Sequence, residues 1–360
     1  MANIISSLLA TQPNGMWETI ITFFESGIGN FAISIILLTL IIKIIMSPID
    51  FFNRRTSKNM AKMQAKIQPQ MEAINKKYAN DPNLKNQKLS ELYKREKINP
   101  MGSCWVMLLN LGLTLAIFIT LLNGMNAMAS YKIQDQYEQL MVAYVQDYAG
   151  EELNLDQEGL SVYEICSPFV IEMNSLEDGE EKTQILNNAN QNVVETYEQT
   201  KESFLWIDNI WMADSPFNNS VPSYSEYANV ARLSNDERNN EEFESVYDYI
   251  MNPLRETRGR TNGYFILLVI CAGVTFLNQW LVIRKNKQNG AAQKAGWGTA
   301  IFMTVFMAFF TLFYTTMFSL YMITGQIVGL VMTPIFDAIN NAIDKHQEKK
   351  SEPKDRLKRI

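Results

Sequence analysis

Long apolar runs alternate with strongly charged segments along this chain, and the runs show neither helical nor strand periodicity. The first run, residues 28–47, reaches about 30 Å as a helix, the thickness of one bilayer core. Further runs lie at 103–122 and 264–283. Residues 295–336 carry no charge over a length that makes roughly 60 Å of helix, which is two spans rather than one. The pattern predicts an all-α polytopic membrane protein with five transmembrane helices.

The distribution of charge predicts the orientation of these spans. Residues 54–97 hold 12 Lys or Arg against 4 acidic residues, and residues 345–360 hold 7 against 3. Residues 132–260 reverse the balance, with 26 acidic residues against 8 basic ones. Basic loops favour the cytoplasm, so we expect the N-terminus and the acidic region outside and the C-terminus inside. The predicted order is an extracytoplasmic N-terminus with an interfacial helix (1–27), span 1 (28–53), a basic cytoplasmic helical hairpin (54–98), span 2 (99–125), a large acidic extracytoplasmic region (126–262), span 3 (263–283), a cytoplasmic loop (284–296), span 4 (297–316), span 5 (317–343) and a basic cytoplasmic tail (344–360).

The segments around the first span carry helical signals. An apolar face at 16–24 predicts a short interfacial helix before the membrane. Pro48 is expected to end the first span. Apolar residues at spacings of three and four then predict a helix over about 57–78, and Asp81 and Pro82 predict the start of a second one. Such a basic hairpin either lies on anionic lipid or contacts a partner protein. Its predicted contact residues are Met60, Met63, Lys62, Lys66, Ile67 and Met71.

Lys43 is the only charged residue in the first apolar run. Thr39, Lys43 and Ser47 share one face of a helix, which gives the span a narrow polar stripe. A lipid-facing charge at this depth costs about 2.5–3.5 kcal/mol, so Lys43 is expected to face protein or water. The alternative is that it lies near the cytoplasmic end and extends its ammonium group to the headgroups.

Several functional classes are disfavoured. The single histidine, His346, argues against a catalytic histidine or a histidine-based metal site, and no phosphate-binding loop motif occurs. The three cysteines suggest no disulfide framework. The start of the chain has neither the basic segment of a signal peptide nor a lipobox cysteine. We therefore expect no enzyme, no cofactor, no metal and no DNA partner. In the acidic region, helices are expected near 137–148 and 183–202, but the pattern predicts no fold.

Four motifs in order give the chain a resemblance to the YidC/Oxa/Alb family of membrane protein insertases. They are GNFAISIILLTLIIKIIMSPI (29–49), the hairpin ending in INPMGSC (98–104), which is close to the family's NPLGGC, FLWIDNIWMADSP (204–216) and the last pair of spans around SLYMITGQIVGLV (319–331). Lys43 stands where the family has its groove arginine or lysine. The chain departs from five-span bacterial relatives in its insertions at 127–202 and 217–262.

The resemblance implies a hydrophilic groove, open to the cytoplasm and the lipid, whose positive charge receives the polar end of a substrate segment without ATP. The groove residues it suggests are Lys43, Thr39, Ser47, Asn110, Thr114, Gln279, Thr304, Thr311, Thr315, Tyr321 and Gln326. It also implies a multi-pass protein of the bacterial plasma membrane whose partners are nascent membrane proteins, the ribosome, the Sec translocon and anionic lipids.

Two other functions compete with that of an insertase. One is a transporter or channel for an anionic solute that uses the intramembrane lysine, but the spans before residue 130 and after 262 show no internal repeat. The other is an adhesion or sensor protein that acts through its acidic region, for which one or two spans would suffice.

Overall fold

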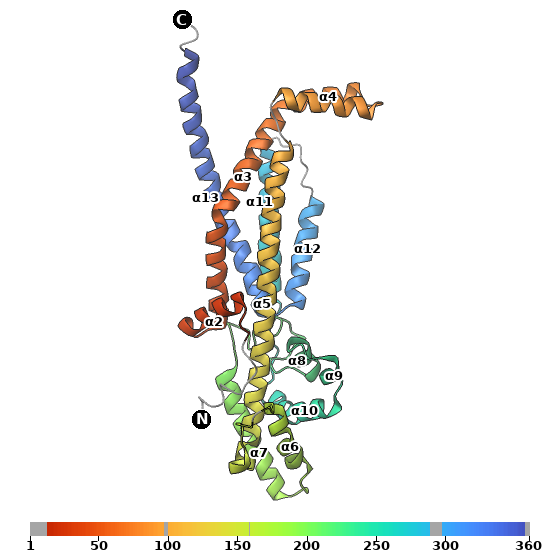
Figure 1. Cartoon of the computed structure of the whole chain (residues 1–360), viewed down its shortest axis with the longest axis vertical. Helices are drawn as coiled ribbons and strands as arrows, with labels where there is room; N and C mark the ends of the chain where they lie inside the picture. Colours follow the sequence, from red (N-terminus) through yellow and green to blue (C-terminus); the bar gives the residue numbers. More distant parts are fainter. Residues whose placement is uncertain (1–12, 97–99, 158, 289–296, 357–360) are drawn as a thin grey trace. The chain divides into compact units, whose positions relative to one another are not determined.

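The structure is a computed structural model that describes residues 13–96, 100–157, 159–288 and 297–356 (Figure 1). Its elements over these residues are helices, and β-type pairing there is limited to two isolated bridges. The fold divides into two compact units. One unit, here called the acidic unit, comprises residues 1–38, 120–271 and 308–321; the other, the membrane unit, comprises residues 39–119, 272–307 and 322–360. The all-helical class is as predicted.

Four helical segments are long and apolar enough to cross a membrane: Phe31–Met60, Leu108–Glu152, Ile266–Arg284 and Thr316–Gln347. The predicted fourth span corresponds to α12 (Trp297–Phe313), which is shorter at 17 residues. The uncharged stretch 295–336 is not one helix, because α12 ends at Phe313 and α13 (Thr316–Arg356) begins three residues later. The described part of the stretch is thus divided between two helices, and the break lies next to the expected turn.

Helix α3 (Phe31–Lys77) passes through Pro48 without interruption, so the expectation that Pro48 ends the first span is wrong. Proline removes one backbone hydrogen bond, and a long helix with many other bonds continues past it. The helix that contains the predicted second span, α5, runs from Pro100 to Ala149 and includes the helix expected near 137–148.

The hairpin of the membrane unit is formed by the C-terminal part of α3 and by α4 (Pro82–Arg95). The predicted cap is confirmed: the side chain of Asp81 accepts a hydrogen bond of 3.0 Å from the backbone N–H of Leu84, and Pro82 is the first helical residue. Ile67 of α3 and Leu92 of α4 are buried against each other's helices. The unit also contains the first part of α5, most of α11 (Ile266–Gln288), the first part of α12 and most of α13.

The acidic unit is a helical bundle with an aromatic core. Its helices are α2 (Met16–Ile28), the end of α5, the short 3-10 helix η1 (Gly150–Glu152), α6 (Val162–Ser175), α7 (Glu180–Thr200), α8 (Tyr224–Val230), α9 (Asn235–Arg238) and α10 (Glu241–Arg258). Helix α7 confirms the helix expected near 183–202. Tyr137, Tyr227 and Tyr247 are buried together, with ring centroids 4.8–5.2 Å apart. This region therefore has a packed core that contains tyrosines, although a high proportion of its residues are polar.

An irregular segment, 201–223, joins α7 to α8 and holds the start of α11 within the same unit. Asp214 is 2% exposed, and its carboxylate accepts hydrogen bonds from the backbone N–H groups of Tyr264 (2.8 Å) and Leu267 (2.6 Å). Asn262 donates to the backbone carbonyls of Asn209 (2.9 Å) and Ala213 (3.1 Å). One buried carboxylate thus accepts from an amide in the first turn of α11, that of Leu267, and from the amide of Tyr264 just before the helix.

Candidate functional site

The predicted polar stripe of α3 lies against α13 within the membrane unit. Thr39 is 1% exposed, and Lys43 is half-buried. Gly325 of α13 is the neighbour: a Cβ atom added there would stand 3.2 Å from Cε of Lys43, 3.9 Å from its Nζ and 3.9 Å from Cγ2 of Thr39. The lysine side chain therefore runs along a helix surface that has no side chain at this position.

A second polar contact joins α11 to α13 at Gln326, the residue that follows Gly325. Thr275 donates from its hydroxyl to the side-chain oxygen of Gln326 at 2.6 Å, and Asn278 donates to the backbone carbonyl of Gln326 at 3.4 Å. Hydrogen bonds between side chains hold helices together where the surrounding chain is apolar. Gly325 and Gln326 thus bring α13 into contact with both α3 and α11.

The other predicted groove residues are in varied surroundings. In the membrane unit, Ser47 and Gln279 are half-buried, Thr114 is exposed, and the hydroxyl of Thr304 donates to the carbonyl of Ala300 in its own helix. The side-chain oxygen of Asn110 is buried and has no hydrogen-bond partner among the described residues. Three further candidates belong to the acidic unit: Thr311, Thr315 and Tyr321.

Sequence reasoning missed Gly325 and Thr275, which the structure brings to the predicted residues Lys43 and Gln326. A glycine inside a span permits close approach of a neighbouring helix, and Gly325 lies within the motif 319–331. Gly325 was therefore the signal in the sequence that could have indicated a close contact between two spans. Nothing in the sequence distinguishes Thr275 from the other threonines of the spans.

The predicted contact residues of the hairpin are engaged within the chain. Ile67 is 1% exposed in the core between α3 and α4, and Met60, Met63 and Met71 pack against that core. Lys66 pairs with Glu96 at 3.5 Å. In this conformation the apolar face closes the hairpin instead of lying open.

Three basic residues of α3 converge on Asp344 of α13 in the same unit. The carboxylate lies 2.7 Å from the ammonium of Lys62, 3.0 Å from that of Lys58 and 3.7 Å from the guanidinium of Arg55. Asn340 and Asn341 accept hydrogen bonds from Arg55 and Lys58 at 3.2 Å and 2.8 Å. These ion pairs and hydrogen bonds form a second contact between α13 and α3, in addition to the contact at Gly325.

No group of three or more histidine, cysteine or acidic residues suited to a metal ion is present in the part of the chain that the structure describes. The chemistry available at Lys43 is a fixed positive charge with neighbouring hydroxyl and amide groups.

Comparison with known proteins decides the family. The family model described as 60Kd inner membrane protein matches residues 23–342. The chain belongs to this family, the YidC/Oxa/Alb family of membrane proteins. Together with the long apolar helices, this membership makes the chain a multi-pass protein of the bacterial plasma membrane.

Curated relatives in this family are named membrane protein insertase YidC. The protein of Fusobacterium nucleatum is 43% identical over 100 residues, which are 28% of this chain and 47% of that protein. The proteins of Lawsonia intracellularis and Methylobacterium nodulans are 38% and 41% identical over 29% and 27% of this chain, and over 19% and 15% of their own lengths. The aligned parts are thus less than half of these relatives.

Proposed function

We propose that this protein is a membrane protein insertase and chaperone that moves short polar segments of its substrates across the plasma membrane and releases their hydrophobic segments into lipid. The observation that carries the proposal is the position of Lys43 beside Gly325 of α13. A lysine that lies along a neighbouring helix belongs to the bundle, and a charge within a bundle of spans is a functional group by default.

The proposed mechanism uses the charge of Lys43 as a transient counter-charge. An acidic or polar substrate end that enters the bundle from the cytoplasm loses water, and the ammonium group together with Thr39 offsets part of that cost. Transfer of a substrate's apolar span into lipid is worth on the order of 10 kcal/mol, which suffices to draw a short polar flank across without ATP.

The groove assignment extends to the other predicted residues. In the membrane unit, the buried and unpartnered oxygen of Asn110 and the amide of Gln326 support polar walls on α5 and α13. The proposal retains Ser47, Thr114, Gln279 and Thr304 in the same unit, and Thr311, Thr315 and Tyr321 in the acidic unit. Five spans with the N-terminus outside and the C-terminus inside remain the proposed topology, supported by the distribution of basic residues.

Nascent membrane proteins are the proposed substrates. The basic hairpin and the basic tail favour polyanionic neighbours, namely the ribosome and anionic lipids, and the Sec translocon is a further proposed partner. Because Ile67 and the methionines pack within the hairpin, we assign partner contact to its exposed basic side chains, including Lys62 and Lys66.

The test measures insertion of a single-span substrate with an acidic outer tail in cells that depend on this protein. We expect Lys43→Glu to abolish insertion and Lys43→Arg to retain it. Arg232→Glu is the matched control, because it reverses an exposed charge of the acidic unit. Normal insertion by Lys43→Glu would overturn the proposed role of the charge. Flux of an anionic solute through protein-containing liposomes, lost in Lys43→Glu, would instead indicate a transporter.

A further inference from the structure

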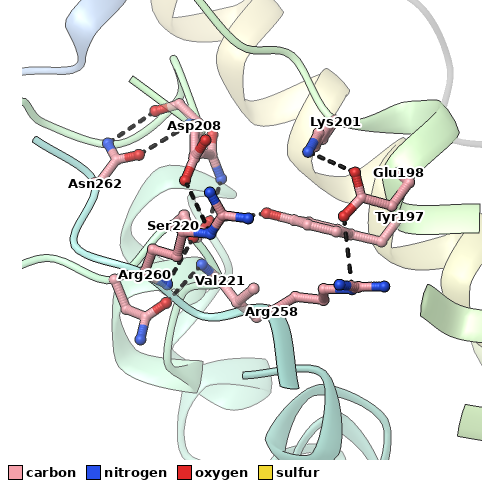
Figure 2. A network of polar contacts seen from close by, with 11 residues as sticks. Tyr197, Glu198, Lys201, Asp208, Ser220, Val221, Arg258, Arg260 and Asn262 are labelled. Carbon is pink, nitrogen blue, oxygen red and sulfur yellow. Dashed lines mark hydrogen bonds and ion pairs between the residues drawn. The ribbon is translucent and has the colours of Figure 1, made fainter. Parts of the chain in front are cut away.

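One edge of the acidic unit is basic. Of the eight basic residues in 132–260, three surround Tyr197 and Ser220 and line one small hollow with them: Lys201, Arg258 and Arg260 (Figure 2). Lys201 pairs closely with Glu198 at 2.6 Å, whereas Arg258 lies 3.7 Å from Glu198 and Arg260 lies 4.0 Å from Asp208. The two arginine side chains are 44% and 70% exposed. Their guanidinium groups are therefore only loosely paired and open to an anion from outside.

Backbone hydrogen bonds between the segments around Ser220 and Arg260 hold this basic edge in place. Ser220 donates from its backbone N–H to the carbonyl of Arg260 at 2.8 Å, and the backbone N–H of Arg260 donates to the hydroxyl of Ser220 at 3.1 Å. Asn219 and Thr261 form an antiparallel bridge beside them. The hydroxyl of Tyr197 donates to the carbonyl of Ser220 at 3.4 Å, which connects α7 to the same pair (Figure 2).

Large apolar side chains project from the same segments. Leu205 is 76% exposed at the tip of a turn closed by two backbone hydrogen bonds between Phe204 and Ile207, and its φ of 54° is unusual for leucine. Phe217 is 86% exposed and stacks edge-on against Phe265 with ring centroids 5.7 Å apart. A strained turn that presents a leucine outward, and an exposed phenylalanine in the same irregular segment, are not explained by packing within the unit.

Part of this surface lies next to the start of a membrane span, since Phe217 contacts Phe265 and Arg260 is six residues before Ile266. Helix α11 begins at Ile266, so Tyr264, which is 65% exposed, precedes the span by two residues. Arg260 precedes Tyr264 by four residues, and Lys201 precedes Leu205 by the same number. Basic residues interleaved with aromatic and leucine side chains at the end of a span are the composition that binds the headgroup layer of a bilayer.

We propose that this edge is a lipid-docking surface: Leu205, Phe217 and Tyr264 enter the headgroup layer, and Lys201, Arg258 and Arg260 bind phosphate groups of anionic phospholipids. A planar guanidinium matches a phosphate with two parallel hydrogen bonds. The region 132–260 carries 18 more acidic than basic residues, so an anionic bilayer repels the rest of its surface. The basic edge therefore selects the face of the acidic unit that approaches the membrane.

The test places an environment-sensitive fluorescent amino acid in the full-length protein, at position 205 or 217, in bilayer discs that contain lipids brominated in the acyl chain. Position 160 is the matched control, because Leu160 is an exposed apolar residue of the same unit. We expect bromine quenching at 205 and 217 but not at 160. Absence of quenching at both 205 and 217 would overturn the docking surface.

A second arm tests the phosphate contacts. Addition of phosphatidylglycerol to zwitterionic discs is expected to raise the quenching at 205 and 217 severalfold. The increase is expected to disappear in the double variant Arg258→Gln and Arg260→Gln and to persist in the control Arg232→Gln. Quenching that is independent of phosphatidylglycerol, or an increase that survives in the double variant, would overturn the binding of lipid phosphate. Neither readout measures insertion of a substrate. The lipid-docking surface can therefore be refuted without refuting the proposed function, and the reverse also holds.

Discussion

Lys43 of α3 lies against Gly325 of α13, with its Cε 3.2 Å from the point where a Cβ atom of residue 325 would stand. At that separation a side chain on residue 325 would require the lysine side chain to shift by a few tenths of an ångström, and a larger side chain would require more. The absence of a side chain on α13 at this position leaves room for Lys43, the only cation of the apolar run 28–47. The candidate site therefore depends on the space beside Gly325 as well as on the charge of Lys43.

The first prediction concerns this space. Gly325→Leu is expected to displace the side chain of Lys43 and to lower substrate insertion about tenfold, the equivalent of roughly 1.4 kcal/mol in the barrier. Gly329→Leu is the matched control on the same helix, because a Cβ at residue 329 meets no atom within 4 Å. Insertion of the acidic-tailed substrate and the amount of protein in the membrane are measured together. Equal insertion by both variants at equal protein levels would contradict the proposed importance of the contact.

The second prediction concerns the start of the third span. Asp214→Ala leaves the backbone amides of Tyr264 and Leu267 without their acceptor in a buried place, which is expected to cost about 1–3 kcal/mol. The melting temperature of the detergent-purified protein should fall. Asp178→Ala removes an acidic residue whose side chain is 98% exposed and paired with Lys182, and this variant should melt like the unchanged protein because surface pairs contribute little. A melting temperature of Asp214→Ala equal to that of the control would refute the capping role.

The third prediction concerns alkaline pH. Burial raises the pKa of the Cys166 thiol in α6 from about 9 to about 12. The folded state therefore keeps a proton that the unfolded state loses above pH 9, and stability should decrease by up to about 1.4 kcal/mol per pH unit between these values. Below pH 9 both states hold the proton, so this cysteine has no effect on the pH dependence there.

Melting temperatures from pH 8 to 11 test this decrease, with Cys166→Ala as the comparison variant. Its alkaline slope should be shallower than that of the unchanged protein. The slope should not vanish, because burial also raises the pKa of Tyr197 to about 12. Identical slopes in the two proteins would show that Cys166 is not protected from ionisation.

The fourth prediction concerns the hairpin. Asp81→Ala removes the cap of α4 and is expected to destabilise the hairpin by about 1 kcal/mol, whereas Asp81→Asn keeps an acceptor at the cap and should have little effect. Limited proteolysis of the full-length protein should cleave α4 faster in the alanine variant only. Faster cleavage in the asparagine variant as well would assign the effect to lost charge instead of a lost cap.

Local signals in the sequence predicted well those features that depend on neighbouring residues. The cap at Asp81 and the first helical position of Pro82 follow from backbone chemistry within one turn, and the helix over 180–200 follows from its own pattern. The continuation of α3 past Pro48 was missed because one lost hydrogen bond does not decide the end of a helix with many others. The core of the acidic unit was missed because Tyr137, Tyr227 and Tyr247 are far apart in sequence and amphipathic, so nothing in a local window shows that they pack together.

The sequence by itself determined that this chain is helical, that it crosses the membrane several times and that a single cation lies in its first span, because the free energy of placing apolar and charged groups in lipid depends on the residues alone. Only the tertiary structure decided that Lys43 lies against Gly325, that Gln326 binds Thr275 and that Asp214 caps the third span. Those contacts join residues more than 50 positions apart, and such pairs meet only when separate helices pack against one another.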